Sequence, residues 1–183
     1  SVCARPKRHP SPGLASMLID THCHLDALEF AADRPEVLAA ARLAGVGAFV
    51  VPAVSLVSCA AVRDLAREEA DCHPAYGLHP LYLDGVDADT LLALRAFIAA
   101  EMGGPRPPVA IGETGLDYYV PGYDAKHQEE VFLAQLRLAR EFDLPVLLHV
   151  RRAVDRVLSC LRRVRVRGGV AHAFNGSRQQ ADA

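Results

Sequence analysis

The sequence lacks the features that mark several large classes of protein. Its 183 residues carry a net charge of only -2, so the surface as a whole is not the strongly basic one of many nucleic-acid-binding domains, although a local basic patch is compatible with this balance. No apolar run approaches the roughly 20 residues of a membrane span, and we expect no membrane partner. With 51% hydrophobic and 23% charged residues, the composition predicts a soluble globular chain with a sizeable core.

The cysteines form no recognisable framework. There are five, an odd number, and no CxxC pair occurs: Cys3, Cys23, Cys59, Cys72 and Cys160. Neither a set of disulfides nor a zinc knuckle is therefore indicated. Unpaired thiols suit a reducing compartment, and we predict a cytoplasmic location.

The first 16 residues differ in composition from the rest. They are rich in proline and basic residues and contain no apolar segment of the kind found in secretory signals. We interpret residues 1–16 as a disordered leader and residues 17–183 as the folded part, with Met17 as a possible biological start.

A unit of about 25 to 35 residues recurs after the leader: a short apolar run, a polar loop and an amphipathic helix. This alternation predicts an α/β fold with parallel strands. We expect six strands, at residues 18–22, 48–53, 74–78, 109–112, 144–148 and 169–171. No GxGxxG motif follows the first of them, which disfavours a dinucleotide-binding sheet.

Polar residues stand at the carboxyl end of most expected strands, which is where a (β/α)8 barrel builds its active site. We therefore predict a TIM-type barrel. A complete barrel needs about 250 residues, so we expect a barrel truncated after about six βα units, with C-terminal units missing. The alternative is a naturally short, open α/β domain.

The stretch Ile19 to His24 carries the first chemical motif. In a strand, residues i and i+2 face the same way, so His22 and His24 can reach one metal ion. Two unrelated polar residues at a strand end are the alternative. Cys23 should point to the other side, as a small buried residue.

Five strand-end residues together have the composition of a two-metal hydrolytic site. We expect His22 and His24 to hold one divalent ion, His149 and His172 to hold a second, and Glu113 to bridge both. Gly112 and Gly115 flank the glutamate and permit close backbone approach. These ligands suit Zn, Mn, Co or Fe about equally. We interpret His79, whose neighbour Pro80 can end the strand, as a surface or hydrogen-bonded residue rather than a ligand.

The motifs resemble those of the TatD family of metal-dependent deoxyribonucleases. The matching stretches, in family order, are IDTHCHLD (19–26), YGLHP (76–80), IGETGLDYY (111–119), HQEEVFLAQLRLAREFDLPVLLHVRRA (127–153) and VAHAFNGS (170–177). The resemblance implies a barrel with a dinuclear site on the same five residues. It also implies phosphodiester hydrolysis of DNA, often as an exonuclease dependent on Mg or another divalent ion. The implied partner is single-stranded DNA or its 3′ ends, and no obligate protein partner is evident.

The sequence departs from the family pattern at two points. The family's later Thr-Asp-Ser/Ala-Pro stretch, whose aspartate completes the first metal site, does not occur here, which leaves an inactive metal-binding fragment as an alternative. The family's His-Ser-Arg reads His149-Val150-Arg151. A further alternative is an amidohydrolase-type barrel that cleaves C–N or ester bonds. Many such enzymes bridge their metals with a modified lysine, where this chain has Glu113.

Residues beside the expected ligands favour contact with nucleic acid. Arg151 is a catalytic candidate, because a guanidinium suits bidentate contact with phosphate, and Arg152 follows it. Tyr118 and Tyr119 are candidates for stacking on an unpaired base. The alternatives are a solvated helix start for the arginines and an outer rim for the tyrosines.

Overall fold

The computed structural model describes residues 17–182, and the expected leader lies outside the described residues. Its centre is one sheet of six parallel strands in sequential order. The strands are β1 (Leu18–Asp20), β2 (Val46–Pro52), β3 (Cys72–Tyr76), β4 (Ala110–Asp117), β5 (Val146–Arg151) and β6 (Gly169–His172). The helices are α1 (Arg34–Leu43), α2 (Leu56–Glu68), α3 (Ala88–Met102), α4 (Ala125–Glu141), α5 (Val154–Arg163) and α6 (Arg178–Ala181), and a 3-10 turn, η1 (Leu28–Phe30), precedes α1.

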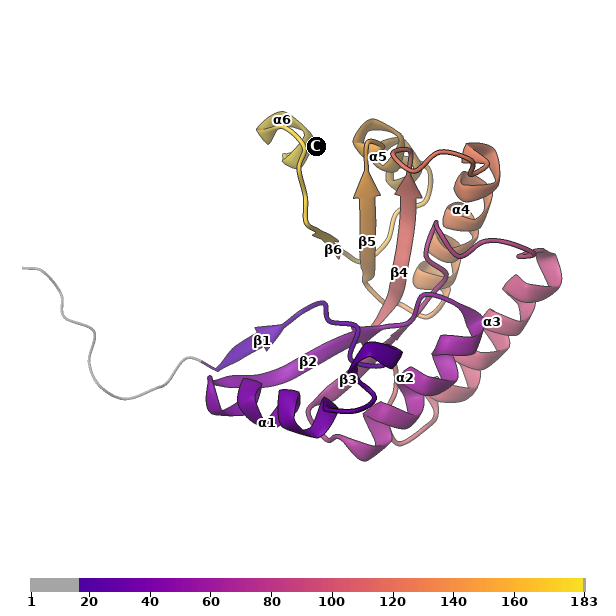
Figure 1. Cartoon of the computed structure of the whole chain (residues 1–183). Helices are drawn as coiled ribbons and strands as arrows, with labels where there is room; N and C mark the ends of the chain where they lie inside the picture. Colours follow the sequence, from indigo (N-terminus) through magenta and orange to yellow (C-terminus); the bar gives the residue numbers. More distant parts are fainter. Residues whose placement is uncertain (1–16, 183) are drawn as a thin grey trace, which may run out of the picture.

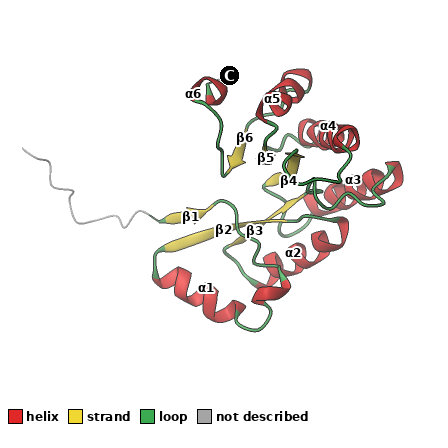
Figure 2. Ribbon diagram, turned by 45° about the horizontal axis from the view of Figure 1, so that its top comes forward, coloured by secondary structure: helices red, strands yellow, loops and turns green. Residues whose placement is uncertain are grey.

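The sheet curls into an open half-barrel that carries its helices on the outer side (Figures 1 and 2). Each strand is followed by a helix, as a right-handed βα repeat requires. Six βα units of a TIM-type barrel are therefore present, as the sequence predicts. In the described part of the chain, β1 and β6 are the two edges of the sheet.

Two strands are longer than the sequence indicates. The expected fourth strand stops at Gly112, but β4 continues to Asp117 with all eight of its residues buried. The expected fifth strand stops at Leu148, but β5 continues to Arg151 and pairs with β4 as far as Asp117↔Arg151. Glycines usually interrupt strands, yet in β4 they let two backbones lie close together. Glu113 consequently lies inside a strand rather than in the loop after it.

Local capping explains where the helices begin. Ser55 caps α2 in a reciprocal pair with Ser58, and Asp87 caps α3 in the same way with Thr90. Asp33 occupies the N-cap position of α1, but its side chain makes no capping hydrogen bond. The first turn of α1 contains a proline instead. Its missing N–H costs no hydrogen bond there, because the first N–H groups of a helix have no partner within the helix.

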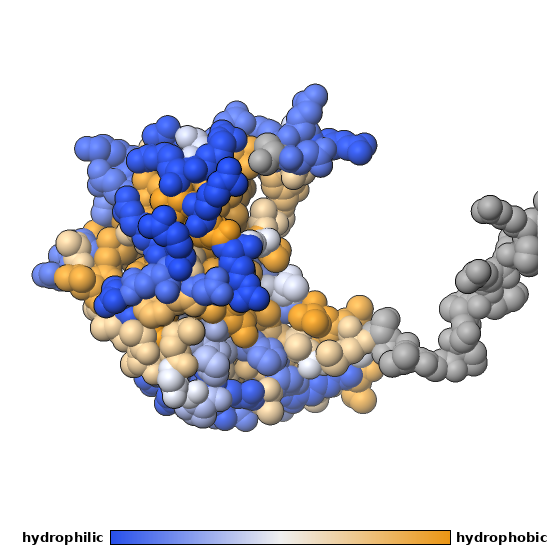
Figure 3. Space-filling model, turned by 180° about the vertical axis from the view of Figure 1, so that it is seen from behind, coloured by the Kyte–Doolittle hydropathy of each residue, from blue (hydrophilic) through white to orange (hydrophobic). Residues whose placement is uncertain are grey.

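The core lies between the outer face of the sheet and the helices. Leu94 and Ile98 of α3 face it, and Phe132 and Leu136 of α4 pack over β4. Apolar side chains are exposed near β1, where Ile19 is 55% accessible, and the view from behind shows apolar surface beside the opening of the half-barrel (Figure 3). Within residues 17–182, no helix combines the length and apolar character needed to cross a bilayer.

Candidate metal centre

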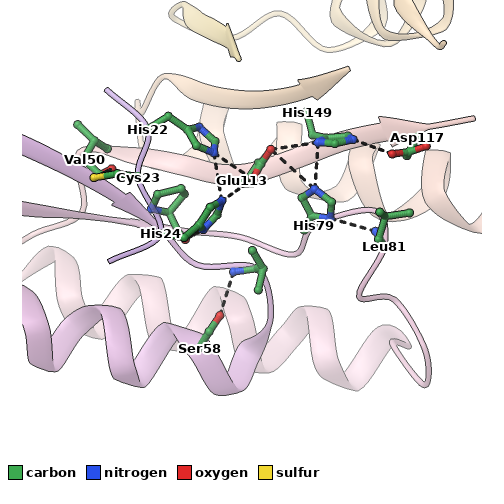
Figure 4. Close-up of polar contacts among 12 residues, drawn as sticks. His22, Cys23, His24, Val50, Ser58, His79, Leu81, Glu113, Asp117 and His149 are labelled. Carbon is green, nitrogen blue, oxygen red and sulfur yellow. Dashed lines mark hydrogen bonds and ion pairs between the residues drawn. The ribbon is translucent and has the colours of Figure 1, made fainter. Parts of the chain in front are cut away.

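Histidine side chains from the ends of three strands converge on the carboxylate of Glu113, which β4 carries (Figure 4). His22 and His24 lie in the loop that follows β1, His79 lies just after β3, and His149 lies on β5. Glu113 is only 2% exposed, although the two histidines of the first motif are partly accessible. The arrangement places the buried carboxylate of Glu113 at the centre of four imidazoles.

The first group of ligand-type atoms contains both residues of the His-x-His motif. Nε2 of His22 lies 3.1 Å from Oε2 of Glu113, Nε2 of His24 lies 3.2 Å from the same oxygen, and the two nitrogens are 3.3 Å apart. Nδ1 of His24 lies 3.2 Å from the carbonyl oxygen of Pro52, which orients the ring. The two rings meet at Glu113, as the i, i+2 spacing predicts.

The second group uses the other oxygen of the same carboxylate. Nδ1 of His149 lies 3.1 Å from Oε1 of Glu113 and 3.0 Å from Nε2 of His79. The His79 nitrogen lies 3.7 Å from that oxygen. His79 is therefore a buried, hydrogen-bonded member of the cluster rather than a surface residue.

Both groups have the spacing expected of ligands around a small divalent ion. Bonds of about 2.1 Å place neighbouring ligand atoms about 3.0 Å apart at right angles and about 3.4 Å apart in a tetrahedron. The six separations in the two groups run from 3.0 to 3.7 Å. Imidazole nitrogens and carboxylate oxygens are also the donors such ions prefer, so the residues present fit a metal.

His172 occupies a different place from the one expected. It lies opposite His149 in the β5–β6 register, but its ring stacks on His22 at 4.1 Å between centroids. Neither compact group of the described residues includes it. Its role as a ligand stays a prediction.

The surroundings of the centre keep the Glu113 carboxyl ionised and the His79 imidazole neutral. Burial opposes ionisation of Glu113, but hydrogen bonds from His149, His22 and His24 outweigh it and hold the pKa of the carboxyl well below its usual range. Burial lowers the pKa of His79 to about 4, so its imidazole is neutral at pH 7. An ionised carboxylate and a neutral imidazole are the forms that bind metal.

Two glycines permit the tight fit of β4 against β5. A Cβ atom on Gly115 would collide with the backbone of His149, and one on Gly112 would crowd Leu147. Both glycines also have positive φ angles, which favour glycine. The expectation of close backbone approach beside Glu113 is confirmed.

Asp117 is a site residue that the sequence analysis missed. It is 2% exposed, and its Oδ2 lies 2.9 Å from Nε2 of His149. Asp117 stands four residues after Glu113 on one strand and so shares its face, a spacing that could have identified it. Cys23, in contrast, directs its thiol to the carbonyl oxygen of Val50, as expected of a residue turned away from the ligands.

Basic and aromatic side chains stack on one another at the ends of β4 and β5. The guanidinium carbon of Arg151 lies 3.8 Å from the ring centre of Tyr119, and that of Arg152 lies 4.6 Å from it. Tyr119 and Arg151 are exposed. We call Tyr119, Arg151 and Arg152 the shelf. Tyr118 lies outside this stack and lines a pocket of about 580 Å³ with Arg152.

Comparison with known proteins gives consistent matches. Residues 19–183 match the family described as TatD related DNase. The chain is 39% identical over 165 residues to the uncharacterized metal-dependent hydrolase YjjV of Escherichia coli K12, covering 90% of this chain and 62% of that protein. It is 35% identical to the 3′-5′ ssDNA/RNA exonuclease TatD of Pantoea sp., covering 91% of this chain and 63% of that protein.

Solved structures agree with these matches. The crystal structure of YjjV superposes with a TM-score of 0.86 at 38% identity, covering 92% of this chain and 64% of the other. A TatD family hydrolase from Entamoeba histolytica, at 19% identity, shares the fold with a TM-score of 0.80. The chain spans a little under two thirds of the length of these relatives.

Proposed function

Because the chain belongs to the family of TatD-related DNases, a family of metal-dependent hydrolases, we propose that its centre holds two divalent ions and hydrolyses phosphodiester bonds in single-stranded nucleic acid. The observation that carries this proposal is the orientation of Glu113. Its two oxygens face two different groups of histidines, which is the geometry of a bridging carboxylate. His22 and His24 would hold one ion, and His79 and His149 would hold the other.

We keep His172 as a further ligand of the second ion, since it is paired with His149 on the neighbouring strand. Such ions, when bound, stabilise negative charge on a phosphoryl group and activate water. Mg, Mn and Zn all suit the donor set. The protein's own contribution is to keep Glu113 ionised and its imidazoles converged in a partly buried pocket.

An amidohydrolase-type centre bridged by a modified lysine has no support in the residues present. The chain contains only two lysines, Lys7 and Lys126. Lys126 is exposed on α4 and faces Glu130 rather than the centre. Lys7 belongs to the part of the chain outside the described residues. The residue that faces both histidine groups is Glu113.

The shelf supports nucleic acid as the substrate class. Arg151 follows His149 by two residues on β5, so a phosphate held by its guanidinium lies beside the centre. Tyr119 offers an exposed ring on which a base can stack. Relatives named 3′-5′ ssDNA/RNA exonuclease favour action at the 3′ end of a single strand.

We also propose that the protein acts in the cytoplasm. The four cysteines that the structure describes are free thiols. Unpaired cysteines in this number suit a reducing compartment.

The test of this function is a metal-dependent nuclease assay. We expect the protein to shorten a single-stranded DNA oligonucleotide labelled at its 5′ end when Mg, Mn or Zn is added, and to do so one nucleotide at a time. Excess EDTA should stop the reaction, since it removes the ions. With a label at the 3′ end instead, the labelled nucleotide should be released in the first step of the reaction. Cleavage that persists in EDTA, or no product with any of the three metals, contradicts the proposal.

Replacing Arg151 with alanine should weaken binding of single-stranded DNA about tenfold or more, because a charge-assisted hydrogen bond contributes about 1.5–3 kcal/mol. The slope of log affinity against log salt should also fall by about 0.7 for one lost phosphate contact. Titration by fluorescence anisotropy at several salt concentrations measures both quantities.

Arg165→Ala is the matched control for this variant. Arg165 is also an exposed arginine, but it lies in the loop before β6, at the opposite end of the strands from Glu113. The Arg165→Ala substitution removes the same charge as Arg151→Ala and leaves the shelf unchanged. Equal losses of affinity in the two variants would show that Arg151 contributes only to the general field of the protein.

A further inference from the structure

The segment that carries His79 into the centre, residues 77–80, is buried although it lies beyond the end of its strand. β3 ends at Tyr76, and its pairing with β4 runs as far as Tyr76↔Ile111. All four residues of the segment are nevertheless buried. A buried backbone N–H or C=O group without a partner is costly, so this segment must find hydrogen bonds outside the sheet ladder.

Two glutamines of α4 supply such partners on both sides of His79. Oε1 of Gln135 accepts the N–H of Leu78 at 2.7 Å, and Nε2 of the same glutamine donates to the carbonyl oxygen of Leu78 at 3.0 Å. Nε2 of Gln128 donates to the carbonyl oxygen of Pro80 at 3.3 Å. The residues before and after His79 are therefore both tied to one helix.

The placing of the two glutamines suits this contact. They stand seven positions apart, which puts them on one face of α4, and the helix packs on β4. Gln135 is fully buried and Gln128 is 2% exposed. Oε1 of Gln128 also accepts the N–H of Asp117, at 2.9 Å, at the end of β4. The oxygen and the nitrogen of each amide thus bond to backbone, which is what these two polar side chains contribute to an otherwise apolar face.

A glycine lets the segment lie close to its neighbours. A Cβ atom on Gly77 would lie 2.8 Å from the backbone of Gly112 and 3.0 Å from Oε1 of Gln135. Gly112 directly precedes Glu113 on β4. The segment is therefore packed between the helix that holds it and the strand that carries the carboxylate.

We infer that two glutamines of α4, Gln128 and Gln135, form a clamp that positions His79 in the centre. They act through the main chain of residues 77–80, so they are positioning residues rather than ligands. The consequence for metal rests on the proposed function, whereas the place of the His79 ring is a property of the protein alone. Loss of partners that orient metal ligands typically lowers metal affinity about 10–100-fold.

Gln135→Met tests the clamp in the metal-free protein. Methionine is also long and unbranched, but it offers no donor and only a weak acceptor, so both backbone groups of Leu78 lose their partner. The rings of His79 and His149 have centroids 4.3 Å apart, which is close enough for a nuclear Overhauser effect between their carbon-bound protons. We expect this effect to disappear in Gln135→Met, because the segment must move to find other hydrogen bonds.

Leu38→Ala is the control for lost stability. Leu38 is fully buried on α1, which packs on β2, and its truncation leaves a cavity away from His79. We expect this variant to unfold at a lower temperature, as Gln135→Met should, and to keep the Overhauser effect between the rings of His79 and His149. Losing the effect in both variants would show that it reports stability alone, and the inference would fall.

Two backgrounds then show which ion the clamp serves. His22→Ala/His24→Ala keeps only the second group of histidines, and His79→Ala/His149→Ala keeps only the first. Adding Gln135→Met should weaken Zn binding about 10–100-fold in the first background and leave it unchanged in the second. Each background controls for the other, because the same substitution has the same effect on the fold in both. Isothermal titration measures the affinities.

The outcomes separate this inference from the proposed function. An Overhauser effect that persists in Gln135→Met overturns the inference. A change in Zn affinity that is equal in both backgrounds, or absent from both, also overturns it. A wild type that binds no metal overturns the proposed function, and the Overhauser effect then decides the inference. If Gln135→Met does not fold, Gln128→Met replaces it with the same two measurements, since it frees Pro80 and keeps both hydrogen bonds of Leu78.

Discussion

Glu113→Gln should abolish hydrolysis, lowering the rate by about a thousandfold or more. The amide keeps one oxygen and presents an NH₂ group to the other histidine group, so no ligand bridges both. It also removes the buried negative charge that all four imidazoles face. Losing several kcal/mol of charge stabilisation corresponds to this factor, since each 1.36 kcal/mol changes the rate tenfold. Initial rates on labelled single-stranded DNA measure it.

A second buried glutamate gives the control for this variant. Glu101 is 7% exposed and pairs with Arg67 at 3.1 Å, on α3 and outside both ligand groups. Glu101→Gln also exchanges a buried carboxylate for an amide, so it reports what the exchange does to folding alone. We expect it to lower thermal stability and to keep the rate per folded molecule. Similar rates for Glu113→Gln and the wild type would end the assignment of Glu113 as the bridge.

The sequence was most informative where periodicity and spacing act locally. Parallel strands place their carboxyl ends on one edge, so residues expected at strand ends, such as His22, Glu113 and His149, could be grouped from the sequence alone. The His-x-His motif has both side chains on one face by the geometry of extended chain alone. These inferences needed no knowledge of how the barrel curves.

The residues that sequence analysis missed depend on longer-range geometry. His79 is followed by Pro80, which is also how a strand simply ends, and only the curvature of the sheet brings it to His149. Asp117 was missed because the expected fourth strand stopped at Gly112, whereas β4 continues to Asp117. The stacking of His172 on His22 joins strands far apart in sequence order, which no local pattern could specify.

The number of bound ions should divide between the two groups of histidines. We expect the wild type to bind two ions per chain, and His22→Ala/His24→Ala and His79→Ala/His149→Ala to bind about one each. Either pair of substitutions leaves Glu113 and the opposite histidines in place, and each group has its own carboxylate oxygen. Metal analysis by mass spectrometry after dialysis counts the ions.

His73→Ala/His127→Ala is the matched control, since both histidines lie outside the two groups. It should keep two ions, which excludes adventitious binding by surface imidazoles.

A single shared ion gives another pattern: the wild type would bind one ion, and each of the two site variants would lose it. Two ions in the wild type that both vanish in one variant would show instead that the sites fill in order, with one group required before the other. The two carboxylate oxygens of Glu113 face different histidine groups, and no histidine belongs to both groups. We therefore expect each double variant to lose one bound ion and to keep the other.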